Sequence, residues 1–161
     1  MTFQDFIERG ILQPARDMLR QDANEDVRLS VLAPRGDVFC MSFAAGHSLL
    51  SKTKFSLPIK DSISRFAYER GEPFVSLDLD DETAYAPHPL ASRPYRSIIS
   101  LPISGGETIW GVFNVISTRP HAFEDVDVEY VQLLGSIINV ATSLIIANAP
   151  EEHPQLPEPT D

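Results

Sequence analysis

Residues 97–134 have the sequence SIISLPISGGETIWGVFNVISTRPHAFEDVDVEYVQLL. Two apolar runs, 96–103 and 108–117, are separated by a Gly-Gly turn, and this pattern predicts a β-hairpin. Beyond the hairpin, the apolar residues predict a long helix over 123–148. Because they cover more than one side of that helix, it either lies deep or serves two surfaces.

The chain upstream predicts a second hairpin and two N-terminal helices. Strand-like runs 27–33 and 38–45 flank a Pro-Arg-Gly-Asp turn, whose proline and glycine suit a tight reversal. Residues 1–21 carry apolar side chains at helical spacing, and Pro14 predicts a break at which the second helix begins.

The middle of the chain predicts a helix over 61–70 that is capped by Asp61, and then a short strand over 73–77. Residues 46–60 show no clear period and predict a loop. Residues 78–95 are acidic and then proline-rich, and a long irregular loop in a compact domain is more often functional than accidental. The hairpin-linked strands favour an α+β fold with an antiparallel sheet.

Length and composition predict one domain over residues 1–148, followed by a disordered Pro/Glu-rich tail over 149–161. No basic-apolar leader and no run of roughly 18 apolar residues is found, so we expect a cytoplasmic protein without membrane contact. The formal net charge of −10 disfavours nucleic acid as a partner. Cys40 is the only cysteine, which excludes an internal disulfide and a thiolate zinc cluster.

Residues 97–134 resemble the C-terminal half of GAF domains, in which a Gly-Val-x-Asn-Val strand is followed by a phenylalanine, acidic residues and a long helix. Residues 43–48 and 64–82 resemble further GAF elements, and the resemblance extends over about 25–148. A PAS-like or profilin-like sheet is the nearest structural competitor. The resemblance implies an antiparallel sheet of about six strands, with the terminal helices on one face and a loop-lidded pocket on the other.

GAF domains bind cyclic nucleotides, bilins, haem, small anions or metabolites, and many chiefly dimerise. The cyclic-nucleotide motif needs a lysine after Asn114 and a glutamate after Asp127, and valine follows both residues here. A structural role is therefore expected for Asn114, Phe123 and Asp127. Bilin attachment needs a cysteine near the pocket lid, whereas Cys40 lies in an apolar strand and is expected to pack in the core.

Enzymatic and metal-dependent chemistry is not expected. Free-methionine-sulfoxide reductases of the GAF family use several cysteines, and this chain has one. His88 is the candidate for haem ligation, although its proline neighbours also suit a plain loop residue, and the other histidines are expected to be solvated. No catalytic residue, no metal site and no particular cofactor is predicted, and the chain is expected not to be an enzyme.

The long loop and the strand after it are expected to supply ligand-binding side chains. The candidates are Tyr85, His88, Arg93, Tyr95, Arg96, Ser97 and Asn114. The arginines suggest a small anionic metabolite, because a guanidinium fork suits a carboxylate or phosphate. The alternative is that the arginines pair with nearby aspartates, at positions 78, 80 and 81.

Two functions follow from these expectations. The first is a small-ligand-sensing regulatory module that acts in signal transduction through a partner protein. The second is a dimerising interaction module without a physiological ligand, for which the apolar surplus of the helix over 123–148 would supply the homodimer contact.

Overall fold

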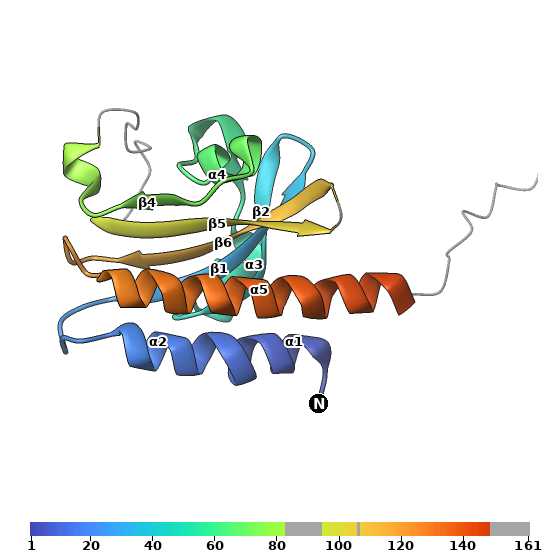
Figure 1. Cartoon of the computed structure of the whole chain (residues 1–161), viewed down its shortest axis with the longest axis horizontal. Helices are drawn as coiled ribbons and strands as arrows, with labels where there is room; N and C mark the ends of the chain where they lie inside the picture. The colour runs from blue at the N-terminus through green and yellow to red at the C-terminus, as the bar shows by residue number, and fades with distance from the viewer. Residues whose placement is uncertain (83–94, 106, 149–161) are drawn as a thin grey trace, which may run out of the picture.

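The structure is a computed structural model of the chain and describes residues 1–82, 95–105 and 107–148 (Figure 1). The predicted tail over 149–161 and most of the predicted loop over 78–95 lie outside these residues. The domain boundary at residue 148 therefore stays a prediction.

Six antiparallel strands form one sheet with the order β3-β2-β1-β6-β5-β4. Their bounds are β1 Val27–Arg35, β2 Val38–Ala45, β3 Leu57–Pro58, β4 Phe74–Ser76, β5 Ser97–Gly105 and β6 Thr108–Ser117. Both predicted hairpins are present, as β1–β2 and β5–β6. The predicted α+β class and the six-stranded sheet are confirmed.

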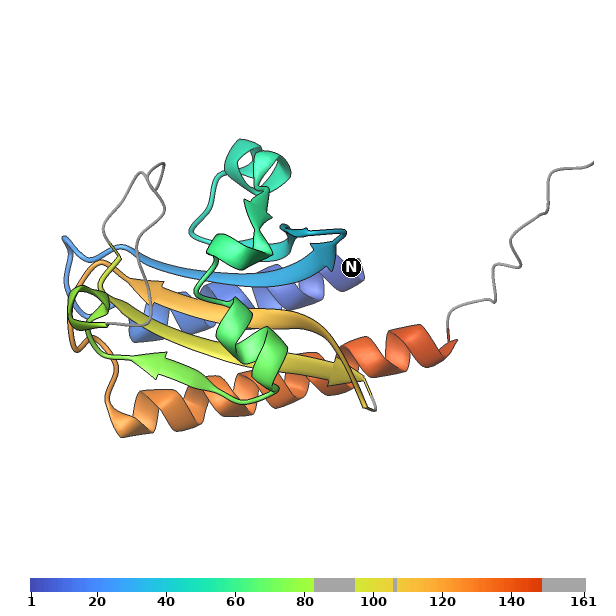
Figure 2. The same ribbon diagram turned by 90° about the horizontal axis from the view of Figure 1, so that it is seen from above.

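The helices occupy both sides and one edge of this sheet. They are α1 Phe3–Asp5, the π-helical η1 Phe6–Leu12, α2 Gln13–Leu19, α3 Leu49–Lys54, the 3-10 helix η2 Ile59–Asp61, α4 Arg65–Arg70, the 3-10 helix η3 Leu79–Asp81 and α5 Asp125–Asn148. The N-terminal helical segment and α5 lie on the same side of the sheet and run in opposite directions (Figure 1). Helix α4 lies on the other side, and α3 lies near the β2 edge (Figure 2).

The main core lies between the sheet and the two terminal helical segments. Alternate residues of the central strands, such as Leu29, Ile99 and Phe113, are fully buried there against Ile7 and Val131. Each such side chain contributes about 1.5–3 kcal/mol by burial. A second, smaller cluster lies on the opposite face and consists of Leu32, Phe39, Met41, Ala67 and Val112.

The predicted break at Pro14 is wrong, because the helical segment continues from α1 to α2 without interruption. Proline lacks the N–H that would bond to the fourth residue before it, and its ring clashes with the preceding turn. Here η1 is π-helical up to Leu12, and the N–H of Gln13 bonds to the carbonyl of Glu8. A wider turn before the proline relieves the constraint.

Two predictions for residues 46–70 are also wrong. Residues 49–54 form α3, whose first turn is capped by Ser48, since its side chain accepts a hydrogen bond from the Ser51 N–H at 3.0 Å. Asp61 belongs to η2 and does not cap the following helix, which begins four residues later at Arg65.

Helix α5 has an inner and an outer face. Val131, Leu134 and Ile138 pack on the sheet, whereas the outer face carries exposed apolar side chains. The segment Asp125–Ile145 has the length and the mean hydropathy, 1.4, of a helix that could span a membrane. Core helices of water-soluble domains often pass the same test, so this finding alone assigns no membrane contact.

Candidate functional site

A row of small polar side chains crosses the sheet on the face opposite the terminal helices. Ser30 of β1 pairs with Asn114 of β6, which pairs in turn with Ser100 of β5. Their neighbours along each strand belong to the main core, and successive side chains alternate between faces. These three residues, called the polar row below, therefore point away from the terminal helices.

Hydrogen bonds connect the polar row to the segment that begins α4. Ser100 Oγ donates to Asn114 Oδ1 at 2.7 Å, and Asn114 Nδ2 donates to Ser64 Oγ at 2.6 Å. The Ser64 N–H donates to Ser62 Oγ at 3.0 Å. All four side chains are buried. A satisfied polar network in a low-dielectric interior fixes one geometry, so the Asn114 amide holds the start of α4 against the sheet.

Ser97, a predicted site residue, lies on the other face. Its Oγ is 3.1 Å from the Leu77 carbonyl and 2.5 Å from the Arg119 carbonyl, and it accepts from the Ala122 N–H at 3.2 Å. The structure therefore does not bring Ser97 and Asn114 together. Ser100 is the strand residue that meets Asn114, and the alternation of β5 could have identified it.

Arg96 forms ion pairs with two carboxylates, those of Asp78 and Asp80. Its Nη2 is 2.6 Å from Asp78 Oδ2 and its Nε is 3.1 Å from Asp78 Oδ1, which makes a bidentate pair. The Nε is also 3.2 Å from Asp80 Oδ2. The hydrogen bonds from Arg96 hold the pKa of Asp78 below its usual value. This is the pairing that the alternative interpretation of the arginines anticipates.

The remaining predicted site residues lie partly outside the described residues. Tyr85, His88 and Arg93 fall in the segment 83–94 and are not placed. Tyr95 lies two residues before β5, and the guanidinium carbon of Arg28 is 5.9 Å from the centre of its ring. Arg28 also contacts Asp26 at 3.0 Å, so its charge is paired.

His47 was predicted to be solvated, and this prediction is wrong. The left-handed backbone of Gly46, with φ +87°, turns the chain after β2 and places the imidazole near Arg28 and Arg16. Its Nδ1 is buried without a hydrogen-bond partner among the described residues. Burial, together with the charge of Arg28, lowers the pKa of His47 to about 4.

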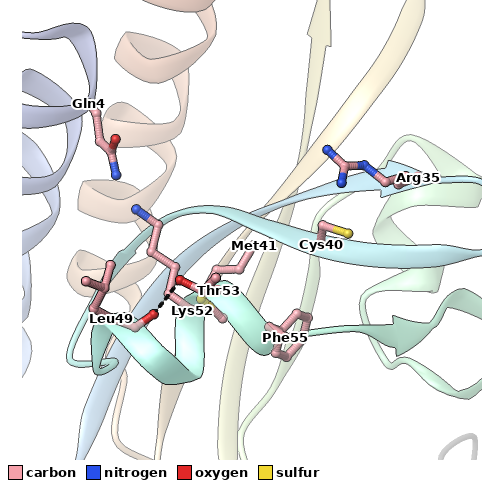
Figure 3. A pocket seen from close by; sticks show the side chains of 8 residues that line it. All are labelled: Gln4, Arg35, Cys40, Met41, Leu49, Lys52, Thr53 and Phe55. Atoms are coloured by element: carbon pink, nitrogen blue, oxygen red, sulfur yellow. Dashed lines mark hydrogen bonds between the residues drawn. The ribbon is translucent and has the colours of Figure 1, made fainter.

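A hollow of about 320 Å³ opens at the β2 edge of the sheet, between α1, β2 and α3 (Figure 3). We call it the α3 hollow, and it is lined by Gln4, Arg35, Cys40, Met41, Leu49, Lys52, Thr53 and Phe55. Cys40 is only partly buried and lines this hollow, so the expectation that its thiol packs in the core is wrong. The missed element α3 forms one wall, which is why the sequence did not indicate the hollow.

Over residues 1–82, 95–105 and 107–148, no group of three or more His, Cys, Asp or Glu residues is placed to hold a metal ion.

A sequence model of the GAF domain matches residues 26–143. The chain belongs to the GAF domain family. GAF domains are regulatory and sensing modules found in signalling proteins, and this assignment agrees with the sheet order and terminal helices described above. No curated protein sequence matches the chain.

Solved GAF-fold structures are similar to this GAF domain over most of its length. The GAF domain of an Acinetobacter phosphoenolpyruvate-protein phosphotransferase is 15% identical with a TM-score of 0.75, covering 94% of this chain and 89% of that one. A GAF domain/HD domain protein from Geobacter sulfurreducens is 12% identical with a TM-score of 0.62, covering 83% and 90%. Identities this low show the shared fold alone.

The expectation that the chain is not an enzyme is contradicted by a third neighbour. Free methionine-R-sulfoxide reductase from Neisseria meningitidis, solved with its substrate, is 17% identical with a TM-score of 0.63, covering 84% of this chain and 78% of that one. A reductase of the same class from Staphylococcus aureus is also similar. Since enzymes share this fold, membership of the GAF family does not exclude catalysis.

Proposed function

We propose that this GAF domain is a small-ligand-sensing regulatory module that acts in signal transduction through a partner protein. The observation that carries the proposal is the polar row beneath α4. Buried polar side chains on an otherwise apolar sheet face are unfavourable for stability unless they are hydrogen-bonded. The donors and acceptors of Ser100, Asn114 and Ser64 now bond to one another, and a polar ligand could take the place of one of these partners.

The hydrogen bond between Asn114 and Ser64 gives this site a means of signalling. A ligand that accepts a hydrogen bond from Asn114 Nδ2 competes with Ser64 Oγ, to which that amide now donates. The exchange would replace one hydrogen bond with another, at small net free energy, and would release the start of α4 from the sheet. A partner protein that contacts α4 would then distinguish the liganded from the free module.

The ligand is proposed to be a small anionic metabolite that also contacts Tyr85, His88, Arg93 and Tyr95. Arg96 can take part only if one of its carboxylate partners leaves. Asp80 is the more readily displaced, because its side chain is 65% exposed, whereas the Asp78 side chain is 10% exposed. An incoming carboxylate or phosphate would replace Asp80 at Arg96 Nε and keep the Asp78 pair.

Native mass spectrometry of the purified protein, followed by thermal shift with the ligand found, tests this proposal. Asn114→Ala is expected to raise the dissociation constant of the ligand by about fivefold to tenfold, because one buried hydrogen bond is lost. Asn24→Ala is the matched control, since Asn24 is exposed, and it should keep the full shift. A protein without any adduct and without a shift from a nucleotide and metabolite panel would contradict ligand sensing.

A second candidate function is homodimerisation, and the outer face of α5 favours it. Five apolar side chains there are between 41% and 64% exposed and recur at intervals of three, four or seven residues: Val126, Leu133, Ile137, Val140 and Leu144. This is the heptad spacing of a coiled-coil seam. We call these residues the α5 stripe.

The charges of α5 suit pairing with a second copy. Residues 130–148 contain no charged side chain, although the whole chain carries −10. The acidic residues of α5, Asp125, Asp127 and Glu129, lie at its N-terminal end. In an antiparallel pair, the acidic ends of the two copies would lie about 36 Å apart, given 1.5 Å per residue. We therefore propose an antiparallel α5–α5 contact.

Leu133→Glu is expected to raise the dimer dissociation constant by about 100-fold, because both copies would bury an unpaired carboxylate. Sedimentation velocity over a concentration series measures this constant. Gln132→Glu is the control, since it adds the same charge beside the α5 stripe but outside it, and it should leave the dimer intact. A wild-type monomer at all concentrations would rule out this candidate.

A further inference from the structure

We propose that the α3 hollow is a second ligand site, distinct from the polar row, and that it binds a small amphipathic anion. Such a ligand has an apolar chain or ring and one carboxylate, phosphate or sulfonate group. This inference goes beyond the function proposed above and does not depend on it.

The walls of the hollow suit the apolar part of the ligand. Met41 of β2, Leu49 of α3 and Phe55 at the end of α3 line it (Figure 3). Leu49 is 78% exposed in the free protein, so a bound chain would remove its surface from water. A volume of about 320 Å³ is at the small end of the range for ligand pockets, which fits a ligand of modest size.

Arg35, at the end of β1, is suited to the anionic group. Arg35 belongs to the lining and, in the part of the chain that the structure describes, no carboxylate lies within ion-pair distance of its guanidinium. Lys52, the other cation of the lining, is already paired, since its Nζ is 2.9 Å from Glu8 Oε2. Arg35 is therefore the available donor, and its planar fork matches a carboxylate or phosphate.

The charge around the hollow differs from that of the rest of the chain. The lining of the hollow includes two cationic side chains, Arg35 and Lys52, and no aspartate or glutamate, and the one carboxylate beside it, that of Glu8, is paired with Lys52. The chain as a whole carries −10. A local positive potential on an acidic protein attracts small anions to this edge and away from the remaining surface.

Contacts of Glu8 fix the hollow before any ligand binds. Glu8 Oε2 accepts from the Ala44 N–H at 2.8 Å, and its carboxylate also holds Lys52. These bonds join η1, β2 and α3, which come from separate parts of the chain. A site whose walls are already held in place loses less entropy when a ligand binds.

Octanoate is the probe for this site, and the single cysteine, Cys40, is the reporter. The rate of Cys40 alkylation by N-ethylmaleimide is measured by mass spectrometry with and without octanoate. We expect octanoate to slow the reaction several-fold at about 10 mM, where a ligand with a dissociation constant of 1 mM is about 90% bound. At about 1 mM of each compound, which keeps the alcohol in solution, 1-octanol lacks the charge and is expected to protect Cys40 less well than octanoate.

Arg35→Gln is expected to raise the octanoate dissociation constant by about tenfold, as loss of a charge-assisted hydrogen bond predicts. Arg70→Gln is the control, because it removes the same charge at the end of α4, outside the lining. Protection is compared within each variant, so that a change in the intrinsic reactivity of Cys40 cancels. Asn114→Ala should leave octanoate binding unchanged, which separates this site from the polar row.

An unchanged alkylation rate at about 10 mM octanoate would overturn the proposal, since even a weak site would then be largely filled. Equal protection by octanoate and 1-octanol would overturn the anionic part of it. If Arg35→Gln and Arg70→Gln changed the octanoate dissociation constant equally, Arg35 would not be part of the site. The anionic part of the proposal would then also be overturned.

Discussion

Gly111→Ala is expected to destabilise the protein by about 3 kcal/mol, the upper end of the effect of overpacking a core. Gly111 lies in β6, where a Cβ atom would be 2.6 Å from the carbonyl oxygen of Leu32 in β1. The contact is with backbone, which cannot rotate away as a side chain can. Relief would require β1 and β6 to separate near Val31 and Leu32, where the β1–β2 register already shifts.

Urea denaturation monitored by circular dichroism measures this effect. Gly10→Ala is the control, because Gly10 is exposed in η1 and the nearest atom to its Cβ would be Phe6 Cδ2, at 3.8 Å. That variant should be neutral or more stable by about 1 kcal/mol, as alanine is the better helix former. A loss below about 1 kcal/mol for Gly111→Ala would contradict the close approach of β1 and β6.

The second large effect is a loss of stability as pH falls from about 6.5 to about 4, caused by His47. The folded protein keeps this imidazole neutral down to a pKa of about 4, whereas the unfolded chain protonates it near 6.5. Between these values the unfolded state binds more protons, so the free energy of unfolding falls as pH falls. Allowing for partial solvent exposure, we expect a loss of about 2 kcal/mol.

Urea midpoints measured at a series of pH values test this prediction. His47→Asn should flatten the decline between pH 6.5 and 4.5, because it removes the titrating group. His121→Asn, which replaces an exposed histidine, is the control for the substitution itself. Glu8 and Glu25 have pKa values held below 4.5, so the stability that they contribute is lost only at lower pH. Parallel profiles for His47→Asn and wild type would contradict the assignment.

Much of the fold was predictable from local patterns. The hairpins followed from strand-like runs on either side of glycine turns, and the long helix followed from its apolar spacing. These signals are local because strand alternation and helical spacing are each read within about ten residues. They were sufficient for the GAF resemblance and the α+β class.

The candidate site was less predictable, because its key contacts join distant residues. Ser64 and Asn114 are 50 residues apart in sequence, and no local pattern links them. The pairing of Arg96 with Asp78 joins residues 18 apart and was anticipated only as an alternative. Ser97 was grouped with Asn114 by position along the chain, although strand alternation places them on opposite faces.

The sequence by itself determined five of the six strands, the long helix, the family and the acidic character of this protein, because periodicity and composition are local or additive properties; β3 lies in the segment predicted as a loop. Only the tertiary structure decided that Pro14 stays within a helix, that residues 49–54 form α3, and that His47 is half-buried with its Nδ1 away from solvent. It also decided that Cys40 and Arg35 line one hollow. These features depend on contacts such as Glu8 with Lys52, 44 residues apart, whose free energy outweighs weak local preferences.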